Sequence, residues 1–168
     1  SEFRAQNRGG VGAKGSDTRN EDFIEHIYPA SMHNSMLFFT QKGRCYWLKV
    51  YEIPEGAKNS KGRAIQNMLN IDSDDCVKAF ICTKSLGDSE FVNTHNLVFA
   101  TKKGVIKKTR LEAYSRPRSK GVNAIIIREG DELLAVEMTD GNSEILLANR
   151  NGRAIRFPES KVREMGRM

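Results

Sequence analysis

Three segments of this chain share one pattern: a short apolar run, a polar turn that contains glycine, and a second run that carries Lys or Arg. They are residues 36–49, 97–108 and 145–157. Their turn glycines, Gly43, Gly104 and Gly152, lie 61 and 48 residues apart, a spacing typical of propeller blades and similar arrays. The runs are rich in β-branched and aromatic residues and are bounded by Gly, Asn and Asp, which predicts strands. The pattern therefore indicates a repeated β-hairpin and an all-β chain.

Each hairpin belongs to a longer repeat. An acidic turn and an apolar strand precede it, at residues 21–27, 74–81 and 130–136. A basic glycine loop follows it, at residues 60–63, 119–121 and 165–167. The second unit is longer, which fits a polar insertion at residues 85–90 that would extend one hairpin. Helix signals are weak, and only residues 159–164 predict a single turn. We expect a loop at 1–20 and blades at 21–73, 74–129 and 130–168, the last one truncated.

A small antiparallel sheet cannot bury both of its faces alone, so such units are expected to stack on one another. The chain starts without methionine and stops where the pattern predicts another strand, so we expect it to be part of a larger protein. On the pattern alone, a β-sandwich whose hairpins merely look alike stays open.

The composition is that of a globular protein, with 39% hydrophobic and 29% charged residues, and the formal net charge is +6. A basic balance favours polyanionic partners. No apolar run approaches the roughly 20 residues of a membrane span, and no signal sequence is present. Cys45, Cys76 and Cys82 lie in apolar patterns and are expected to be reduced, buried side chains of a cytoplasmic protein. No CxxC occurs and the histidines have no zinc-like spacing, so we expect no metal site.

The segment 6–15 holds four glycines within seven residues, together with Arg8 and Lys14. Such a run cannot form a stable helix or an interior strand. Its backbone could approach a phosphate closely while Arg8 supplies a bidentate charge. Taken alone, the segment fits a phosphate cradle and a flexible linker equally well.

Together with the repeats, residues 6–12 (QNRGGVG) resemble the box motif of the C-terminal domains of DNA gyrase A subunits, whose usual form is QRRGGKG. The resemblance runs essentially end to end, through residues 21–24, 49–54, 104–109, 130–133 and 156–166. It implies a β-pinwheel, a propeller-like disc of about six four-stranded blades that exchange strands, with DNA bent around a basic rim. This chain would hold the box and about three four-stranded antiparallel blades. Asn7 and Val11 stand where the usual box has basic residues, which leaves the strength of phosphate binding there open.

The resemblance further implies binding, bending and wrapping of double-stranded DNA without sequence preference. This would support ATP-dependent negative supercoiling by a whole type II topoisomerase, an isomerase of the bacterial cytoplasm and nucleoid. The DNA-cleaving tyrosine would lie in an upstream domain, so the chain itself would be non-catalytic. ATP and Mg²⁺ would act elsewhere in the complex, and no cofactor is expected here. The partners would be DNA, the B subunit of gyrase and the rest of the A subunit, with no membrane.

Three alternatives remain. One is the related domain of topoisomerase IV, which the box disfavours because that domain lacks an intact one. Another is a propeller-like protein-interaction module whose basic rim is incidental. RNA binding would need exposed aromatic side chains for stacking, whereas Phe38, Trp47 and Phe99 are expected in strand cores.

Smooth bending of a 20–30 bp site by 40–90° costs on the order of 1–6 kcal/mol, so we expect cations distributed along a rim rather than one charged loop. The predicted DNA-binding residues of the box segment are Gln6, Arg8, Gly9, Gly10, Gly12 and Lys14. Those of the repeats are Lys42, Arg44, Lys61, Arg63, Lys102, Lys103, Lys107, Arg116, Arg118, Lys120, Arg150 and Arg153. Further candidate cations along the rim are Lys108, Arg156, Lys161, Arg163 and Arg167. Strand alternation should send Lys107 and Lys108 to opposite faces.

Overall fold

The computed structural model describes residues 34–53, 63–84, 86–148 and 151–167, and of residues 63–65 the backbone only. The strands in this part are β1 (Ser35–Thr40), β2 (Arg44–Lys49), β3 (Val77–Thr83), β4 (Asn96–Thr101), β5 (Ile106–Arg110), β6 (Val122–Asn123), β7 (Leu133–Thr139), β8 (Glu144–Ala148) and β9 (Ala154–Pro158). Short helices are α1 (Arg63–Met68) and α2 (Ser89–Thr94), with 3-10 turns η1 (Val50–Glu52), η3 (Leu111–Tyr114) and η4 (Glu159–Lys161). The expectation of a mostly β chain is confirmed.

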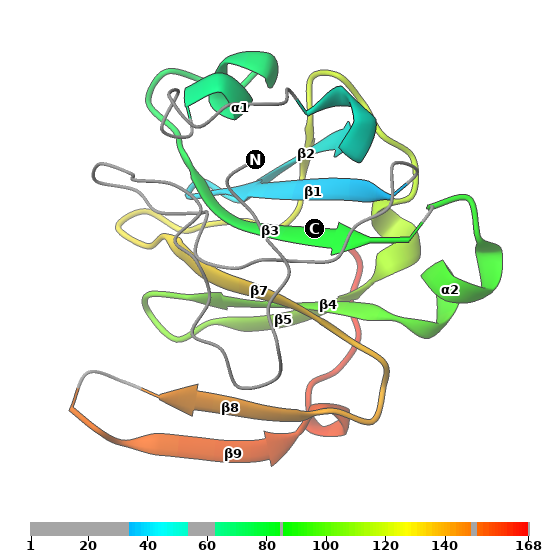
Figure 1. Cartoon of the computed structure of the whole chain (residues 1–168). Helices are drawn as coiled ribbons and strands as arrows, with labels where there is room; N and C mark the ends of the chain where they lie inside the picture. Colours follow the sequence, from blue (N-terminus) through cyan, green and yellow to red (C-terminus); the bar gives the residue numbers. More distant parts are fainter. Residues whose placement is uncertain (1–33, 54–62, 85, 149–150, 168) are drawn as a thin grey trace, which may run out of the picture.

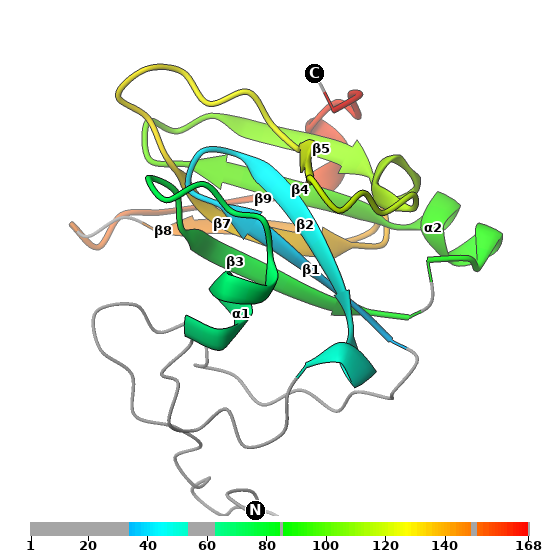
Figure 2. The same ribbon diagram turned by 90° about the horizontal axis from the view of Figure 1, so that it is seen from above.

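The strands form three antiparallel sheets (Figures 1 and 2). The first sheet has the order β3-β1-β2-β6, the second β5-β4-β7, and the third is the β8-β9 hairpin. The sheets therefore have four, three and two strands among the described residues, rather than four each. Figure 1 shows them one below another, with the second sheet between the other two.

The three predicted hairpins are present as β1-β2, β4-β5 and β8-β9. Each hairpin turn places its glycine at positive φ, with Gly43 at 87°, Gly104 at 88° and Gly152 at 78°. This conformation is open to glycine and strained for other residues, which explains why glycine recurs at the turn.

The sheets are completed across the repeat boundaries. The strand β3, which follows the second acidic turn, pairs with β1 of the preceding hairpin. In the same way β7, which follows the third acidic turn, pairs with β4. The strand β6 adds to the outer edge of β2, and the segment near Glu164 follows the edge of β5. The boundaries at 21, 74 and 130 stay a prediction, but each of the first two sheets draws strands from two consecutive units.

The two acidic turns within the described residues each cap the turn of the hairpin before them. The Asp75 carboxylate accepts hydrogen bonds from the backbone N–H groups of Lys42 and Cys76. Asp131 accepts in the same way from the N–H groups of Lys103 and Glu132. One carboxylate thus satisfies two backbone donors at each of these junctions.

The main core lies between the first and second sheets. Its centre is aromatic: the ring of Phe39 packs edge-on against those of Phe99 and Tyr114, with centroids 5.3 and 6.1 Å apart. Phe38 lies in a second cluster on the other face of the first sheet. Trp47 packs against the main cluster and donates its Nε1–H to the carbonyl oxygen of Tyr114 at 2.9 Å. The predicted placement of the aromatic side chains in strand cores is therefore confirmed.

Two short helices were not expected from the sequence. The predicted insertion at residues 85–90 does not extend a hairpin; it connects β3 of the first sheet to β4 of the second and leads into α2. Asp88 caps α2 by accepting from the N–H of Phe91 at 3.1 Å. The helix α1 lies between β2 and β3 in the sequence. The predicted turn at 159–164 is present as η4.

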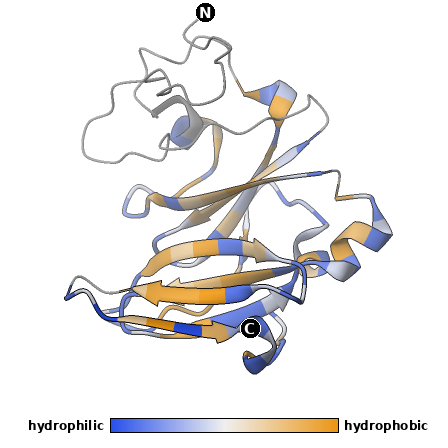
Figure 3. Ribbon diagram, turned by 60° about the horizontal axis from the view of Figure 1, so that its bottom comes forward, coloured by the Kyte–Doolittle hydropathy of each residue, from blue (hydrophilic) through white to orange (hydrophobic). Residues whose placement is uncertain are grey.

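The third sheet is the least covered part of the described chain. Leu146 of β8 and Ile155 of β9 are 66% and 64% exposed, and apolar stretches on the lower sheets come forward in Figure 3. Among the described residues, no helix is long and apolar enough to cross a membrane.

Candidate nucleic-acid interface

The densest group of exposed cations lies in the turn at residues 116–121, between η3 and β6. Arg116, Arg118 and Lys120 are all exposed. Arg116 pairs with Glu112 four residues earlier, at 2.6 Å. No ion pair engages Arg118 or Lys120 within the described part of the chain. This turn therefore presents at least two positive charges directly to solvent.

The turn is held against the outer edge of β2. Gly121 has φ +72°, and a Cβ on it would lie 2.7 Å from the Tyr46 ring and 2.9 Å from the Cys45 carbonyl oxygen. Only glycine permits this close approach. The following strand β6 then pairs Val122 with Cys45 and Asn123 with Arg44.

Arg44 is partly exposed, and its guanidinium donates to this turn and to the strand that follows it. Its Nη2 donates to the Lys120 carbonyl oxygen at 2.6 Å and its Nη1 donates to Asn123 Oδ1 at 3.0 Å. Its guanidinium carbon lies 6.0 Å from the centroid of the Tyr46 ring. The predicted cation is in place, but its donors contact protein.

The cations of the hairpin turns differ in how they are engaged. Lys42 forms an ion pair with Asp74, and the hydrogen bond between the two side chains raises the pKa of Lys42. Lys103 donates from Nζ to the Glu129 carbonyl oxygen at 3.3 Å, next to the acidic turn that caps its backbone. Lys102 is exposed, and its backbone N–H donates to the carbonyl oxygen of Glu132. Among these three lysines, an ion pair in the described residues engages only Lys42.

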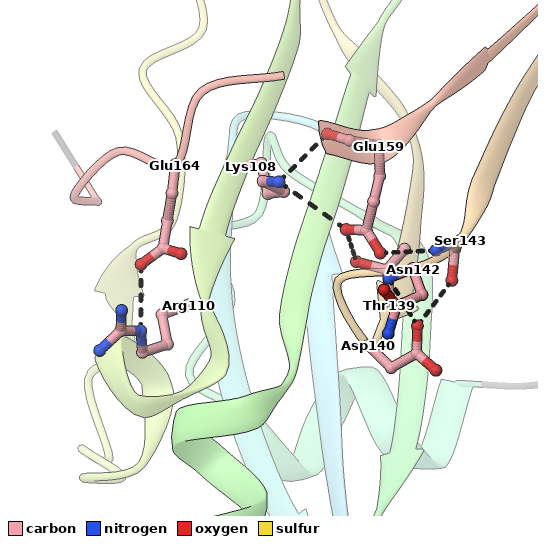
Figure 4. Close-up of polar contacts among 8 residues, drawn as sticks. All are labelled: Lys108, Arg110, Thr139, Asp140, Asn142, Ser143, Glu159 and Glu164. Carbon is pink, nitrogen blue, oxygen red and sulfur yellow. Dashed lines mark hydrogen bonds and ion pairs between the residues drawn. The ribbon is translucent and has the colours of Figure 1, made fainter. Parts of the chain in front are cut away.

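Lys107 and Lys108 point to opposite faces of β5, as alternation predicts. Lys107 is half-buried and donates to the carbonyl oxygen of Arg167; burial lowers the pKa of Lys107, and the Arg167 charge adds to this. Lys108 is buried and lies 3.8 Å from a carboxylate oxygen of Glu159, to whose carbonyl oxygen it also donates at 3.1 Å (Figure 4). The hypothesis that Lys108 contacts DNA is therefore wrong, because its charge is committed to a buried ion pair.

The remaining predicted residues divide into two groups. Arg153 is exposed on the approach to β9, and Arg156 pairs with Glu144 across the β8-β9 hairpin at 3.2 Å. Arg63 begins α1 with its side chain outside the described part. Those wholly outside the described residues are Gln6, Arg8, Gly9, Gly10, Gly12, Lys14, Lys61 and Arg150.

Three residues at this interface were not predicted to hold it together. Asn70 donates from Nδ2 to the Ser119 carbonyl oxygen at 3.1 Å. Asn123 accepts from Arg44 through its side chain and from Arg167 Nη1, at 3.2 Å, through its carbonyl oxygen. Arg167, a further candidate cation, thereby joins the edge of the first sheet to Lys107 of the second. These links join residues 44 to 79 positions apart, so no local signal could reveal them.

A family model described as "DNA gyrase C-terminal domain, beta-propeller" matches residues 1–31, 34–83, 95–140 and 143–168. The chain belongs to this family. Curated relatives include the A subunit of DNA gyrase from Halalkalibacterium halodurans, 43% identical over 99% of this chain. The corresponding proteins of Haemophilus influenzae and Staphylococcus aureus (strain MRSA252) are 40% and 44% identical over the same share. The chain spans 18–19% of the length of these gyrase A relatives.

Solved structures agree on the fold. The C-terminal domain of DNA topoisomerase IV superposes with a TM-score of 0.66 at 29% identity, over 80% of this chain and 41% of that one. The E. coli ParC C-terminal domain gives 0.61 at 17% identity, over 88% and 60%. The resemblance to the gyrase A C-terminal domain family is thus confirmed over the whole length, while the DNA-contacting residues stay a prediction.

Proposed function

We propose that this chain binds the backbone of duplex DNA without sequence preference and bends it, as part of the DNA-wrapping domain of a gyrase A subunit. The whole enzyme would use ATP to introduce negative supercoils. The observation that carries the proposal is the turn at 116–121, whose cations Arg118 and Lys120 are exposed and form no ion pair in the described part of the chain. Membership of the gyrase family supports it.

Backbone contacts explain the arrangement of charge better than base readout does. The exposed cations lie on turns and edges, where a phosphate backbone can pass, and each neutralised phosphate releases counterions and adds to affinity. As protein partners we propose the B subunit of gyrase and the remainder of the A subunit. We propose the bacterial cytoplasm as the location. ATP and Mg²⁺ would act outside this chain.

Affinity for a duplex of roughly 40 bp, measured by fluorescence anisotropy across a salt series, tests the proposal. The slope of log affinity against log salt should become shallower by about 0.9 for each phosphate that is no longer neutralised, so Arg118→Met/Lys120→Met should flatten it by about 1.8. Lys42→Met is the matched control: it removes a charge that Asp74 already compensates and should leave the slope nearly unchanged.

Two further outcomes decide whether the chain binds DNA and which turns the DNA follows. Salt-insensitive or absent binding by the unmodified chain would refute DNA binding. Equal effects of the double variant and of Lys42→Met would mean that DNA follows the hairpin turns and not the 116–121 turn. An Arg8→Ala/Gly10→Ala variant in the same series measures whether the box segment adds to the affinity.

A further inference from the structure

We infer that Arg44 is a positioning residue that holds the 118–121 turn in its DNA-binding conformation and makes no phosphate contact of its own. This inference rests on the proposed function. It reverses the role that the sequence suggests for Arg44, a cation at the start of a basic strand.

Three consecutive carbonyl groups of the turn accept hydrogen bonds, one from within the turn and two from outside it. The Arg118 carbonyl oxygen accepts from the Gly121 N–H at 2.9 Å, and the Ser119 carbonyl oxygen accepts from Asn70. The Lys120 carbonyl oxygen accepts from Arg44. Protein N–H donors thus bind all three carbonyl oxygens, which carry the partial negative charge of the turn. The side chains of Arg118 and Lys120 are exposed to solvent. An approaching phosphate therefore meets cations and not carbonyl oxygens.

Arg44 suits this role because of its shape. One of its terminal nitrogens donates to the carbonyl oxygen of Lys120 and the other to the side chain of Asn123, so a single planar group ties the turn to β6. The guanidinium also lies over the Tyr46 ring at cation–π distance, a further contact that favours this position. A lysine would keep the charge but has no rigid fork, and it could not hold both acceptors in the same geometry.

Asn70 is a second residue that holds the same turn, and it carries no charge. It donates to the Ser119 carbonyl oxygen, and its own carbonyl oxygen accepts from the Tyr46 hydroxyl at 3.1 Å. Since asparagine carries no charge, any effect of Asn70 on the DNA affinity must be transmitted through the turn or through a neutral contact that adds nothing to the salt dependence.

The test compares Arg44→Lys, Asn70→Ala, Lys120→Met and Arg44→Lys/Lys120→Met in the anisotropy assay on a 40 bp duplex. Positioning predicts that Arg44→Lys loses about tenfold in affinity although its charge is kept, the size of one charge-assisted hydrogen bond. Asn70→Ala should weaken binding in the same direction. Lys120→Met should cost much less in the Arg44→Lys background than alone, because the turn is already displaced.

The opposite pattern overturns the inference. If Arg44 contacts phosphate directly, Arg44→Lys keeps its affinity and salt slope within about twofold, Asn70→Ala has no effect, and the losses multiply in the double variant. Absence of DNA binding by the unmodified chain would refute the proposed function instead. In that case amide exchange at Gly121 decides: at least tenfold faster exchange in Arg44→Lys supports the positioning role, and unchanged protection refutes it.

Discussion

Replacing Lys108 by methionine should destabilise the chain by about 3–5 kcal/mol, because it leaves the Glu159 carboxylate buried without its countercharge. The Glu159 side chain is 0% exposed and that of Lys108 is 9% exposed. The carboxylate also accepts from the Thr139 hydroxyl at 2.6 Å and from the Ser143 N–H at 2.9 Å (Figure 4). These neutral donors satisfy its oxygens but supply no positive charge.

The repeats themselves provide the compensating variant. Each hairpin can be counted from its turn glycine. Lys108 is the fourth residue after the glycine of the second hairpin, and Trp47 is the fourth residue after that of the first. Glu159 is the seventh residue after the glycine of the third hairpin, and Leu111 is the seventh after that of the second. Trp47 and Leu111 belong to the apolar core between the first two sheets. Lys108→Met/Glu159→Leu imitates that junction and should recover the stability to within about 1 kcal/mol of the unmodified chain.

Urea unfolding, followed by far-UV circular dichroism, measures these differences, and amide exchange in β8 and β9 detects a loss confined to the third sheet. Arg156→Met is the matched control because it breaks the exposed pair with Glu144, worth at most about 1 kcal/mol. The reasoning fails if Lys108→Met costs no more than this control. It also fails if the double variant is as unstable as the single one.

Three other predictions concern stability and reactivity. Burial alone would raise the pKa of Glu159, but the hydrogen bonds to Thr139 and neighbouring backbone, with the Lys108 charge, hold it below the ordinary 4.5. The folded state then binds fewer protons than the unfolded state, so the free energy of unfolding should fall as the pH drops below about 4.5. The fall should be less steep in Glu159→Gln, and unfolding measured across an acid titration checks this. Gly121→Ala should cost about 1–3 kcal/mol more than Gly104→Ala in urea unfolding, since both have positive φ but only Gly121 has neighbours within 4 Å of the added carbon. Burial raises the pKa of the Cys45 thiol, so a thiol reagent at neutral pH should label Cys45 only as fast as the chain unfolds, which mass spectrometry can follow in a urea series.

The hairpins could be predicted because everything that defines them is local. Apolar runs flank a turn whose glycine takes positive φ, and this combination is visible within a dozen residues. The acidic turns can also be recognised in the sequence, but their role as caps cannot. Asp75 and Asp131 each cap a backbone more than 25 residues earlier, and only the folded chain brings those groups together.

The charged residues were harder to interpret because exposure and pairing are tertiary properties. Lys42, Arg44 and Lys108 look alike in the sequence, each a cation in or beside a basic strand. In the fold the first is neutralised by an acidic turn, the second supports a neighbouring turn, and the third is buried. The short helix α2 was missed because the signal of its cap, Asp88, lies within a polar segment that reads equally well as a loop.

Strand exchange has a mechanical consequence. In the proposed function, a duplex bent around the molecule would act as a stressed elastic rod, and its tendency to straighten would pull apart the edges to which it is attached. At the first junction such a pull would load the β1–β3 ladder and the aromatic core together, because β3 bridges the two hairpins. At the second junction β7 ends beside the Lys108–Glu159 pair, because Thr139 donates to Glu159. Under that load the first junction should resist through a strand ladder and a packed core together, whereas the second depends on one buried ion pair and its hydrogen bonds.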